Sequence, residues 1–174
     1  MDDDGCSSDC RKEFRYVFIT NETFAADLGG SQGADEKCQQ AASAVGLQGT
    51  FRAWLSTSSQ QPLDFFAQST VPYRRLDDVQ VAKNWPDLVD GMLDNPINVT
   101  ETTTFVPGPA CEHRAVWTAS FGSGTEYDAN AKSCSDWSST AGTTTGGNPS
   151  TTNVWSTGCP LSCTTQASLY CFEQ

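Results

Sequence analysis

The last eight residues of the chain, 167–174, read ASLYCFEQ and place a cysteine three residues before the end. Residues 169–172 have the apolar and aromatic composition of a short β-strand, and Cys171 lies inside it. A loose chain end seldom contains a cysteine. We therefore expect another part of the chain to hold this last strand in place.

The cysteine content indicates a disulfide-stabilised protein. The chain has 8 cysteines among 174 residues and only one histidine. An even number of widely spaced cysteines favours disulfides over metal sites, and disulfides persist outside the reducing cytosol. The alternative, a cytosolic protein with reduced structural thiols, fits this count poorly. We expect a secreted protein, located outside the cell or on its surface.

The sequence contains no pattern typical of a signal peptide or of a membrane-spanning segment. The start MDDDGC lacks the basic residues and the apolar stretch of a signal peptide, and no apolar run approaches the roughly 20 residues that span a bilayer. These features predict a mature secreted domain behind an added methionine, without membrane insertion. Residues 1–13 are expected to be a polar lead-in, closed on itself by Cys6 and Cys10, and residues 14–174 a single domain.

The net charge limits the classes of partner. Asp and Glu number 21 and Lys and Arg number 10, so the formal net charge is −11. A surface of this sign repels phosphate backbones, heparin-like polymers and anionic lipids. We therefore expect no nucleic acid, heparin or membrane partner. Cations, neutral sugars and other proteins remain as candidate ligands.

The apolar pattern predicts short strands and one longer helix. Residues 13–20 alternate as a half-buried strand does. A helix is predicted at 33–46, with Asp35 and Glu36 in its first turn and Gly46 at its end. Its apolar face is expected to contain Ala34, Cys38, Ala41, Ala42 and Val45. Other predicted elements are a strand at 50–56, a helical turn at 62–68, a hairpin at 73–82 that turns at Asp77 and Asp78, and a core strand at 115–120.

From residue 121 onward the composition changes. Residues 142–153, GTTTGGNPSTTN, contain almost no apolar side chain and in isolation resemble a linker. Trp137, Trp155 and four cysteines bracket this run. We therefore expect a long polar loop at 121–159 that is pinned to the domain.

Several pieces of the sequence, in this order, resemble one family. They are YVFITNETFAADLGGSQGADEKCQQAASAVGLQGTFRAWLS at 16–56, VAKNWPDLVDGMLDNPINV at 81–99, VWTAS at 116–120, CSDWSS at 134–139, Trp155 and SLYCFEQ at 168–174. The chain resembles an uncharacterised family of bacterial extracellular domains with the endostatin-like version of the C-type lectin-like fold. The resemblance covers residues 14–174. Departures are Asp78, where the family tends to have glycine, and the additional cysteines Cys6, Cys10, Cys111 and Cys159.

The resemblance implies an α+β, C-type lectin-like fold with a mixed, mostly antiparallel sheet, one or two short helices and a long loop held by disulfides. In such domains the first and last strands pair, and a cysteine in the first helix is bridged to one in the last strand. The implied disulfides join Cys38 with Cys171 and Cys134 with Cys163. The remaining cysteines are then expected to pair as Cys111 with Cys159 and Cys6 with Cys10.

Catalytic and zinc-binding patterns are weak in this chain. GGSQG at 29–33 matches the G-x-S-x-G motif of serine hydrolases, with Ser31 as nucleophile and His113 as base. The sharp strand-to-helix turn of that motif is missing, because about ten loop residues separate Thr20 from Ser31, and the chain order is awkward, since the acid of the triad should come between the serine and the histidine. We therefore expect no enzyme and keep a serine hydrolase as a remote alternative. The clustered histidines that hold zinc in endostatin, and its heparin-binding arginines, have no counterpart here.

Calcium is the one cofactor to consider. It takes roughly six to eight oxygen ligands, which carboxylates, Asn side chains and carbonyl groups supply. The Glu-Pro-Asn, Gln-Pro-Asp and Trp-Asn-Asp triplets of sugar-binding C-type lectins are absent. The candidate oxygen ligands are Glu126, Asp128, Asn130 and Asp136. The alternative is a solvated acidic surface, which is what acidic clusters usually are.

The loop at 121–159, beside the acidic stretch 87–94, is expected to form the ligand surface. An exposed but restrained loop loses little entropy on binding. The candidate contact residues are Thr143, Thr144, Thr145, Asn148, Asn153 and Trp155. Replacing residues 143–148 with a short Gly-Ser link is expected to leave folding intact and to abolish binding.

These features predict a non-catalytic binding or adhesion module that recognises a glycan or a protein on another surface. The alternative from another class is a structural subunit of an extracellular filament or coat, which would self-assemble. Trp85 and Trp155 either stack on sugar rings or fill the core, and the sequence leaves both open.

Overall fold

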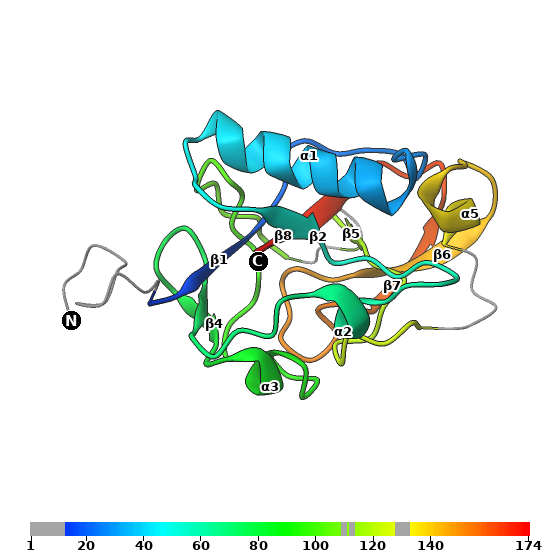
Figure 1. The fold of residues 1–174 in the computed structure, drawn as a ribbon. Coiled ribbons are helices and arrows are strands. Elements are labelled where there is room, and N and C mark those ends of the chain that lie inside the picture. Colours follow the sequence, from blue (N-terminus) through cyan, green and yellow to red (C-terminus); the bar gives the residue numbers. More distant parts are fainter. Residues whose placement is uncertain (1–12, 109–110, 112–113, 128–132) are drawn as a thin grey trace.

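The structure, a computed structural model, describes residues 13–108, 111, 114–127 and 133–174. In this part of the chain a mixed sheet has the strand order β4-β3-β1-β8-β5-β6-β7, and β2 pairs with β8 beside that path. The longest helix, α1, covers one face of the sheet (Figure 1). The strands are β1 (Arg15–Ile19), β2 (Phe51–Ala53), β3 (Tyr73–Arg74), β4 (Gln80–Ala82), β5 (Val116–Trp117), β6 (Thr143–Gly147), β7 (Gly158–Ser162) and β8 (Ser168–Glu173).

The last strand, β8, lies at the centre of the sheet, and every one of its residues is buried. It pairs antiparallel with β1, where Val17 lies opposite Phe172, and antiparallel with β2. It also pairs in parallel with β5. The expected pairing of the first and last strands is therefore confirmed, and so is the expectation that the rest of the chain holds the C-terminal strand.

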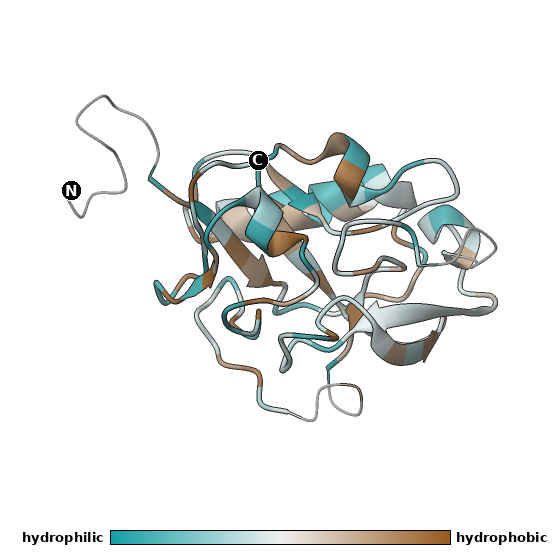
Figure 2. Ribbon diagram, turned by 90° about the horizontal axis from the view of Figure 1, so that it is seen from below, coloured by the Kyte–Doolittle hydropathy of each residue, from teal (hydrophilic) through white to brown (hydrophobic). Residues whose placement is uncertain are grey.

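Two apolar cores lie on the two faces of the sheet, because successive residues of β8 point to opposite sides. Leu169 and Cys171 belong to the core under α1, and Tyr170 and Phe172 belong to the other core. Trp54 is at the centre of the second core. The aromatic rings that pack around it are those of Phe66, Trp85, Trp155 and Phe172. Figure 2 shows apolar residues, in brown, along the strands inside the molecule.

Helix α1 spans Gly30–Ala44, so it begins three residues before the predicted 33–46. The glycine at its first position has a φ of 79°, which lets the chain turn into the helix there. As a consequence Asp35 and Glu36 lie outside the first turn, and their predicted interaction with the helix dipole is wrong. Gly46, with a φ of 78°, follows the helix end as expected.

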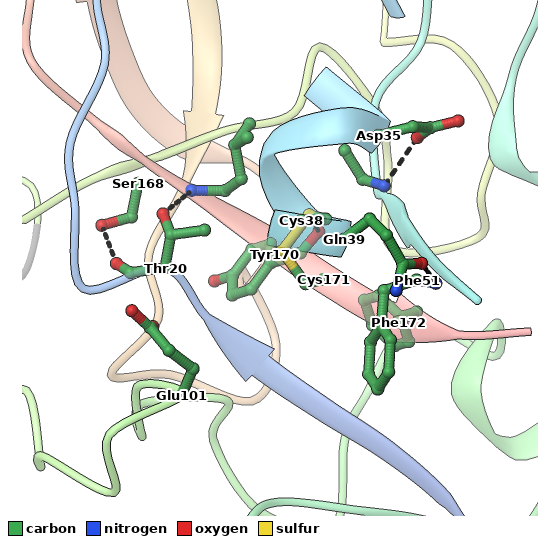
Figure 3. Close-up of a disulfide and its surroundings, with 12 residues drawn as sticks. Thr20, Asp35, Cys38, Gln39, Phe51, Glu101, Ser168, Tyr170, Cys171 and Phe172 are labelled. Carbon is green, nitrogen blue, oxygen red and sulfur yellow. Dashed lines mark hydrogen bonds between the residues drawn. A yellow bond between two sulfur atoms is a disulfide. The ribbon is translucent and has the colours of Figure 1, made fainter. Parts of the chain in front are cut away.

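Side chains of α1 cover the outer edge of β2. Asp35 accepts a hydrogen bond from the backbone N–H of Ala53, and Gln39 accepts one from the backbone N–H of Phe51 (Figure 3). Residues four apart on a helix lie on the same face, so their side chains reach alternate N–H groups of one strand. These bonds occupy the donors to which another strand would pair, and so protect the edge.

The other predicted elements are present but short. The hairpin at 73–82 is formed by β3 and β4, with Asp78 at a φ of 64° in its turn. The turn at 62–68 contains helix α2 (Pro62–Phe65), and α3 (Trp85–Leu88) and α5 (Cys134–Trp137) are further single turns. The strand predicted at 13–20 is buried on both faces at Val17 to Ile19, because the second core covers its other side.

The polar run at 142–153 is not a loop throughout, which corrects the prediction. Residues Thr143–Gly147 form β6, which lies between β5 and β7. The strand packs through its backbone: a Cβ atom at Gly146 would lie 2.4 Å from Cδ1 of Leu161 and 2.6 Å from the carbonyl oxygen of Val116. Replacing 143–148 with a flexible link would remove this strand, so we now expect that replacement to destabilise the fold.

Disulfides join the layers of the described part of the chain. They pair Cys38 with Cys171, Cys111 with Cys159 and Cys134 with Cys163, as expected. The first connects α1 to β8, and the third connects α5 to the segment after β7. The expected pair of Cys6 and Cys10 lies outside the described residues.

Candidate functional site

A polar cleft opens between the first half of α1 and strand β2. Its volume is about 400 Å³. We call it the α1–β2 cleft; its lining residues are Ser31, Gln32, Asp35, Arg52, Gln60 and Phe65. They come from α1, β2, the segment before α2 and the end of α2, so the fold rather than the chain order brings them together.

Arg52 is held in the cleft by contacts on three sides. Its Nε lies 3.5 Å from Oδ2 of Asp35, and its Nη1 donates a hydrogen bond of 3.4 Å to the carbonyl oxygen of Phe65. The guanidinium carbon lies 5.2 Å from the centroid of the Phe65 ring, within cation–π range. The Arg52 side chain is still 39% exposed. A fixed guanidinium therefore faces the open side of the cleft.

Asp35 combines a structural and an electrostatic role in the cleft. Burial raises the pKa of the Asp35 carboxyl above its ordinary value, while the hydrogen bond from the Ala53 N–H and the charge of Arg52 act in the opposite direction. One carboxylate oxygen accepts from the Ala53 N–H, and the other faces the guanidinium of Arg52. Together the two side chains present both an acceptor and donors to a ligand that carries hydroxyl groups.

A second carboxylate, that of Asp136, fixes the chain at Ser58, two residues before the cleft residue Gln60. Asp136 accepts hydrogen bonds from the N–H of Ser58 at 2.7 Å, from its hydroxyl at 2.6 Å and from the hydroxyl of Ser133 at 2.7 Å. The indole N–H of Trp137 donates to the carbonyl oxygen of Ser56 at 2.8 Å. The wall of the cleft at Gln60 is therefore tied to α5.

The backbone of α5 is unusual, because it turns with the left-handed sense. All of its residues, Cys134–Trp137, have φ between 50° and 64°. For residues with a Cβ this conformation costs about 1–2 kcal/mol each. It is held by the disulfide between Cys134 and Cys163, by the buried ring of Trp137 and by the bonds of Asp136.

Asp35 and Asp136 are expected to have opposite effects on stability as pH changes. Burial alone would raise the pKa of Asp136, but the hydrogen bonds from Ser58 and Ser133 outweigh it, and the pKa is lowered from 3.8. A lowered folded-state pKa adds stability above the unfolded pKa, and that stability is lost as pH falls through the folded pKa. The raised pKa of Asp35 has the reverse sign: its contribution is present below the unfolded pKa and is lost as pH rises through the folded pKa.

The measurement is the free energy of unfolding in urea between acidic and neutral pH, for the unmodified protein and for Asp35→Asn and Asp136→Asn. As pH rises, the unmodified protein should lose stability relative to Asp35→Asn and gain stability relative to Asp136→Asn. Each asparagine keeps one acceptor oxygen and does not titrate, so its stability lacks the pH dependence of the carboxylate. At position 136 it also replaces one of the two oxygens that accept hydrogen bonds, which lowers stability without adding a pH-dependent slope. Slopes of equal sign for the two variants would contradict this electrostatic account.

The structure describes two of the four calcium ligands that the sequence suggested, Glu126 and Asp136. Asp136 already accepts the bonds of Ser58 and Ser133, and the N–H of Glu126 donates to the side chain of Gln61. Asp128 and Asn130 lie outside the described residues. Among the residues that the structure describes, no group of three or more His, Cys, Asp or Glu side chains could hold a metal ion.

The ligand surface expected on the polar run requires a correction. Thr144, Thr145 and Trp155 are buried, and Trp155 is 0% exposed. Trp155 fills the second core against Trp54, so it is not available to a ligand. The other members of that set, Thr143, Asn148 and Asn153, are exposed or half-buried and stay candidate surface residues.

The sequence found one lining residue of the cleft, as part of the serine hydrolase motif, and missed the two charged ones. Ser31 lies in the second position of α1 and lines the cleft, while His113, its proposed base, lies outside the described residues. Asp35 and Arg52 were missed as site residues because they are far apart in the chain. The signal for Asp35 was a carboxylate next to the apolar face of a helix, which we assigned to the helix dipole instead.

A comparison with models of protein families matches residues 16–174 to a family described as Collagenase NC10 and Endostatin. The match includes all strands of the sheet apart from Arg15, the first residue of β1, together with both cores and each lining residue of the α1–β2 cleft. In the part of the chain that the structure describes, no helix has the length and apolar character needed to cross a membrane.

Proposed function

The chain belongs to the endostatin family, and on that premise we propose that it is an extracellular module that binds a glycan in the α1–β2 cleft. The family is one of non-enzymatic extracellular domains with a C-type lectin-like fold, and the disulfides of this chain suit the same location. Fold alone does not give a ligand, so the proposal depends on the side chains of the cleft.

The arrangement of Arg52, Asp35 and Phe65 is the observation that carries the proposal. Arg52 offers donors in a fixed planar fork, and Asp35 offers acceptors beside it. Neighbouring hydroxyl groups of a sugar act as both donors and acceptors, so they match this pair. Phe65 adds apolar area for the C–H groups of the ring. Because Arg52 and Phe65 are already held by contacts within the protein, little ordering entropy is lost on binding.

The shape and charge of the site favour a neutral glycan over a protein or a sulfated polymer. The cleft has a volume of about 400 Å³, which lies in the range of about 300–1,000 Å³ typical of small-ligand sites, whereas protein partners usually bind over a broad surface. The net charge of −11 opposes sulfated and phosphorylated polymers at long range. The cleft itself pairs one cation with one carboxylate, so it needs no charged ligand for balance.

The test is a glycan-array screen of the folded protein, followed by affinity measurements on the glycan that binds. Arg52→Ala should weaken binding by at least about tenfold, because hydrogen bonds to a charged group contribute about 1.5–3 kcal/mol. Gln60→Ala, at an exposed cleft position, should weaken it less. The screen is run with calcium and with a chelator, which also tests the calcium set of the polar loop.

Lys83→Ala is the matched control, since it too removes one positive charge that is paired with an aspartate. Lys83 does not line the cleft, so this variant should bind as the unmodified protein does. Equal binding by Arg52→Ala and Lys83→Ala, with both proteins folded, would place the glycan elsewhere. An array without any bound glycan under either condition would overturn the proposal.

A further inference from the structure

A second pocket lies between the turn at 68–70 and the start of α3. Its volume is about 280 Å³. We call it the Trp85 pocket; its lining residues are Gln68, Ser69, Thr70, Asn84, Trp85 and Pro86. None of these side chains is charged, although the chain has a net charge of −11. The lining of the pocket is therefore uncharged, although the protein as a whole is acidic.

The walls of the Trp85 pocket are fixed by bonds within the protein. The backbone N–H of Trp85 donates to the carbonyl oxygen of Ser69 at 2.8 Å, which joins the two sides of the pocket. The Ser69 hydroxyl accepts from the N–H of Val71 at 3.1 Å and donates to its carbonyl oxygen at 2.9 Å. Asn84 accepts from the N–H of Asp87 with its side-chain oxygen. The pocket is therefore formed before a ligand arrives.

Three polar groups of the pocket have no hydrogen-bond partner among the described residues. They are the side-chain amide of Gln68, the hydroxyl of Thr70 and the amide nitrogen of Asn84. They provide both donors and acceptors, without charge. The nearest acid in the chain, Asp87, has its carboxylate turned to Lys83, with its two oxygens on the backbone N–H and the ammonium of that residue.

The floor of the pocket is aromatic. Trp85 is 4% exposed, and its ring is held against Trp54 and Phe66 in the second core. The small exposed part of Trp85 and the side chain of Pro86 give apolar area, and the residues with the free amide and hydroxyl groups line the same pocket. Ligand sites with this composition orient a small polar ring by a few hydrogen bonds and hold it by its apolar face.

We propose that the Trp85 pocket binds one uncharged monosaccharide ring. Uncharged hydroxyl groups can pair with Gln68, Thr70 and Asn84 without leaving a buried charge unpaired. A volume of about 280 Å³ accommodates a single ring rather than a longer chain. The pocket shares no lining residue with the α1–β2 cleft, and α3 lies on the side of the sheet away from α1 (Figure 1). The two sites are therefore separate and are tested separately.

The experiment follows the amide and indole N–H signals of the protein by NMR during titration with neutral methyl glycosides of glucose, galactose, mannose and N-acetylglucosamine. At least one glycoside should shift the signals of 68–70 and 84–85, with a dissociation constant in the millimolar range. Glucuronate and glucosamine, which carry a charge, should shift them less at equal concentration. The pocket proposal is overturned if none of the neutral glycosides shifts these signals.

Two variants separate binding from folding. Thr70→Arg places a long side chain at an exposed position of the pocket rim and should abolish the shifts, while Thr140→Arg makes the same change at an exposed threonine elsewhere and should keep them. Asn84→Asp keeps the oxygen that accepts from Asp87 but replaces the free amide donor, and should weaken binding at least threefold. Arg52→Ala changes the α1–β2 cleft and not the Trp85 pocket, so these shifts should be the same in that variant. Shifts that survive Thr70→Arg would show that the sugar binds elsewhere.

Discussion

A variant in which Cys38 and Cys171 are both replaced by alanine is expected to lose about 5 kcal/mol of stability by the chain-entropy model, given the sequence separation of 133 residues. For a domain of this size the melting temperature should then fall by about 10–20 °C. Both cysteines are 0% exposed, and the bond ties α1 to the central strand (Figure 3). Thermal unfolding followed by circular dichroism measures the loss.

The matched control is the double alanine variant of Cys111 and Cys159. Its loop spans 48 residues, for which the same entropy model gives about 4 kcal/mol. Cys111 is exposed, so this variant creates less of a cavity than the loss of the buried pair does. We therefore expect the Cys38 and Cys171 variant to be clearly the less stable of the two. A difference of only about 1 kcal/mol, which is the difference between the two loop terms, would show that burial adds nothing, and equal losses would contradict the chain-entropy model as well.

The C-terminal strand was predictable from its local apolar pattern, and its disulfide was predictable from the resemblance to the endostatin-like family. A strand pattern that contains Cys171 needs a partner, and Cys38 lies on the apolar face of a predicted helix. The family resemblance then implied that Cys38 pairs with Cys171 and Cys134 with Cys163, and the structure has these pairs. Helix α1 was placed to within three residues, since its period of small apolar residues is clear.

Strand β6 was not predictable from the composition of its residues. Thr and Gly without large apolar side chains are typical of linkers, and β6 is buried because its neighbours cover its backbone. Trp155 was equally ambiguous, because a tryptophan in a polar run is consistent with exposure and with a core anchor. The partners that decide this, Trp54 and Tyr170, belong to other elements, and Trp54 is about a hundred residues away in the chain.

The α1–β2 cleft was missed for a similar reason. Asp35 and Arg52 belong to different elements, and each has an ordinary interpretation on its own element. Their meeting depends on the register between α1 and β2, which the hydrogen bond from Ala53 to Asp35 fixes. A single sequence gives no measure of that register.

Gly147→Ala is expected to destabilise the protein by about 3 kcal/mol or more, or to prevent folding, because overpacking a core with no room to relax is at the upper end of such effects. An added Cβ would lie 2.0 Å from the carbonyl oxygen of Trp155 and 2.9 Å from Cε2 of Tyr170. The same carbonyl oxygen accepts a hydrogen bond of 2.7 Å from the Tyr170 hydroxyl. Backbone and ring would have to move together, and that bond would be lost.

Two variants separate lack of space from the other effects of losing a glycine or changing β6. Gly46→Ala has no atom within 4 Å of the new Cβ but keeps a φ of 78°, so it should cost about 1 kcal/mol through conformation alone. Thr143→Ala, at the exposed start of β6, should change stability by about 0.5 kcal/mol or less. Urea unfolding of the three proteins measures these differences. A Gly147→Ala protein as stable as Gly46→Ala would mean that β6 and the Trp155 segment are not in close contact, and that the polar run is a loop after all.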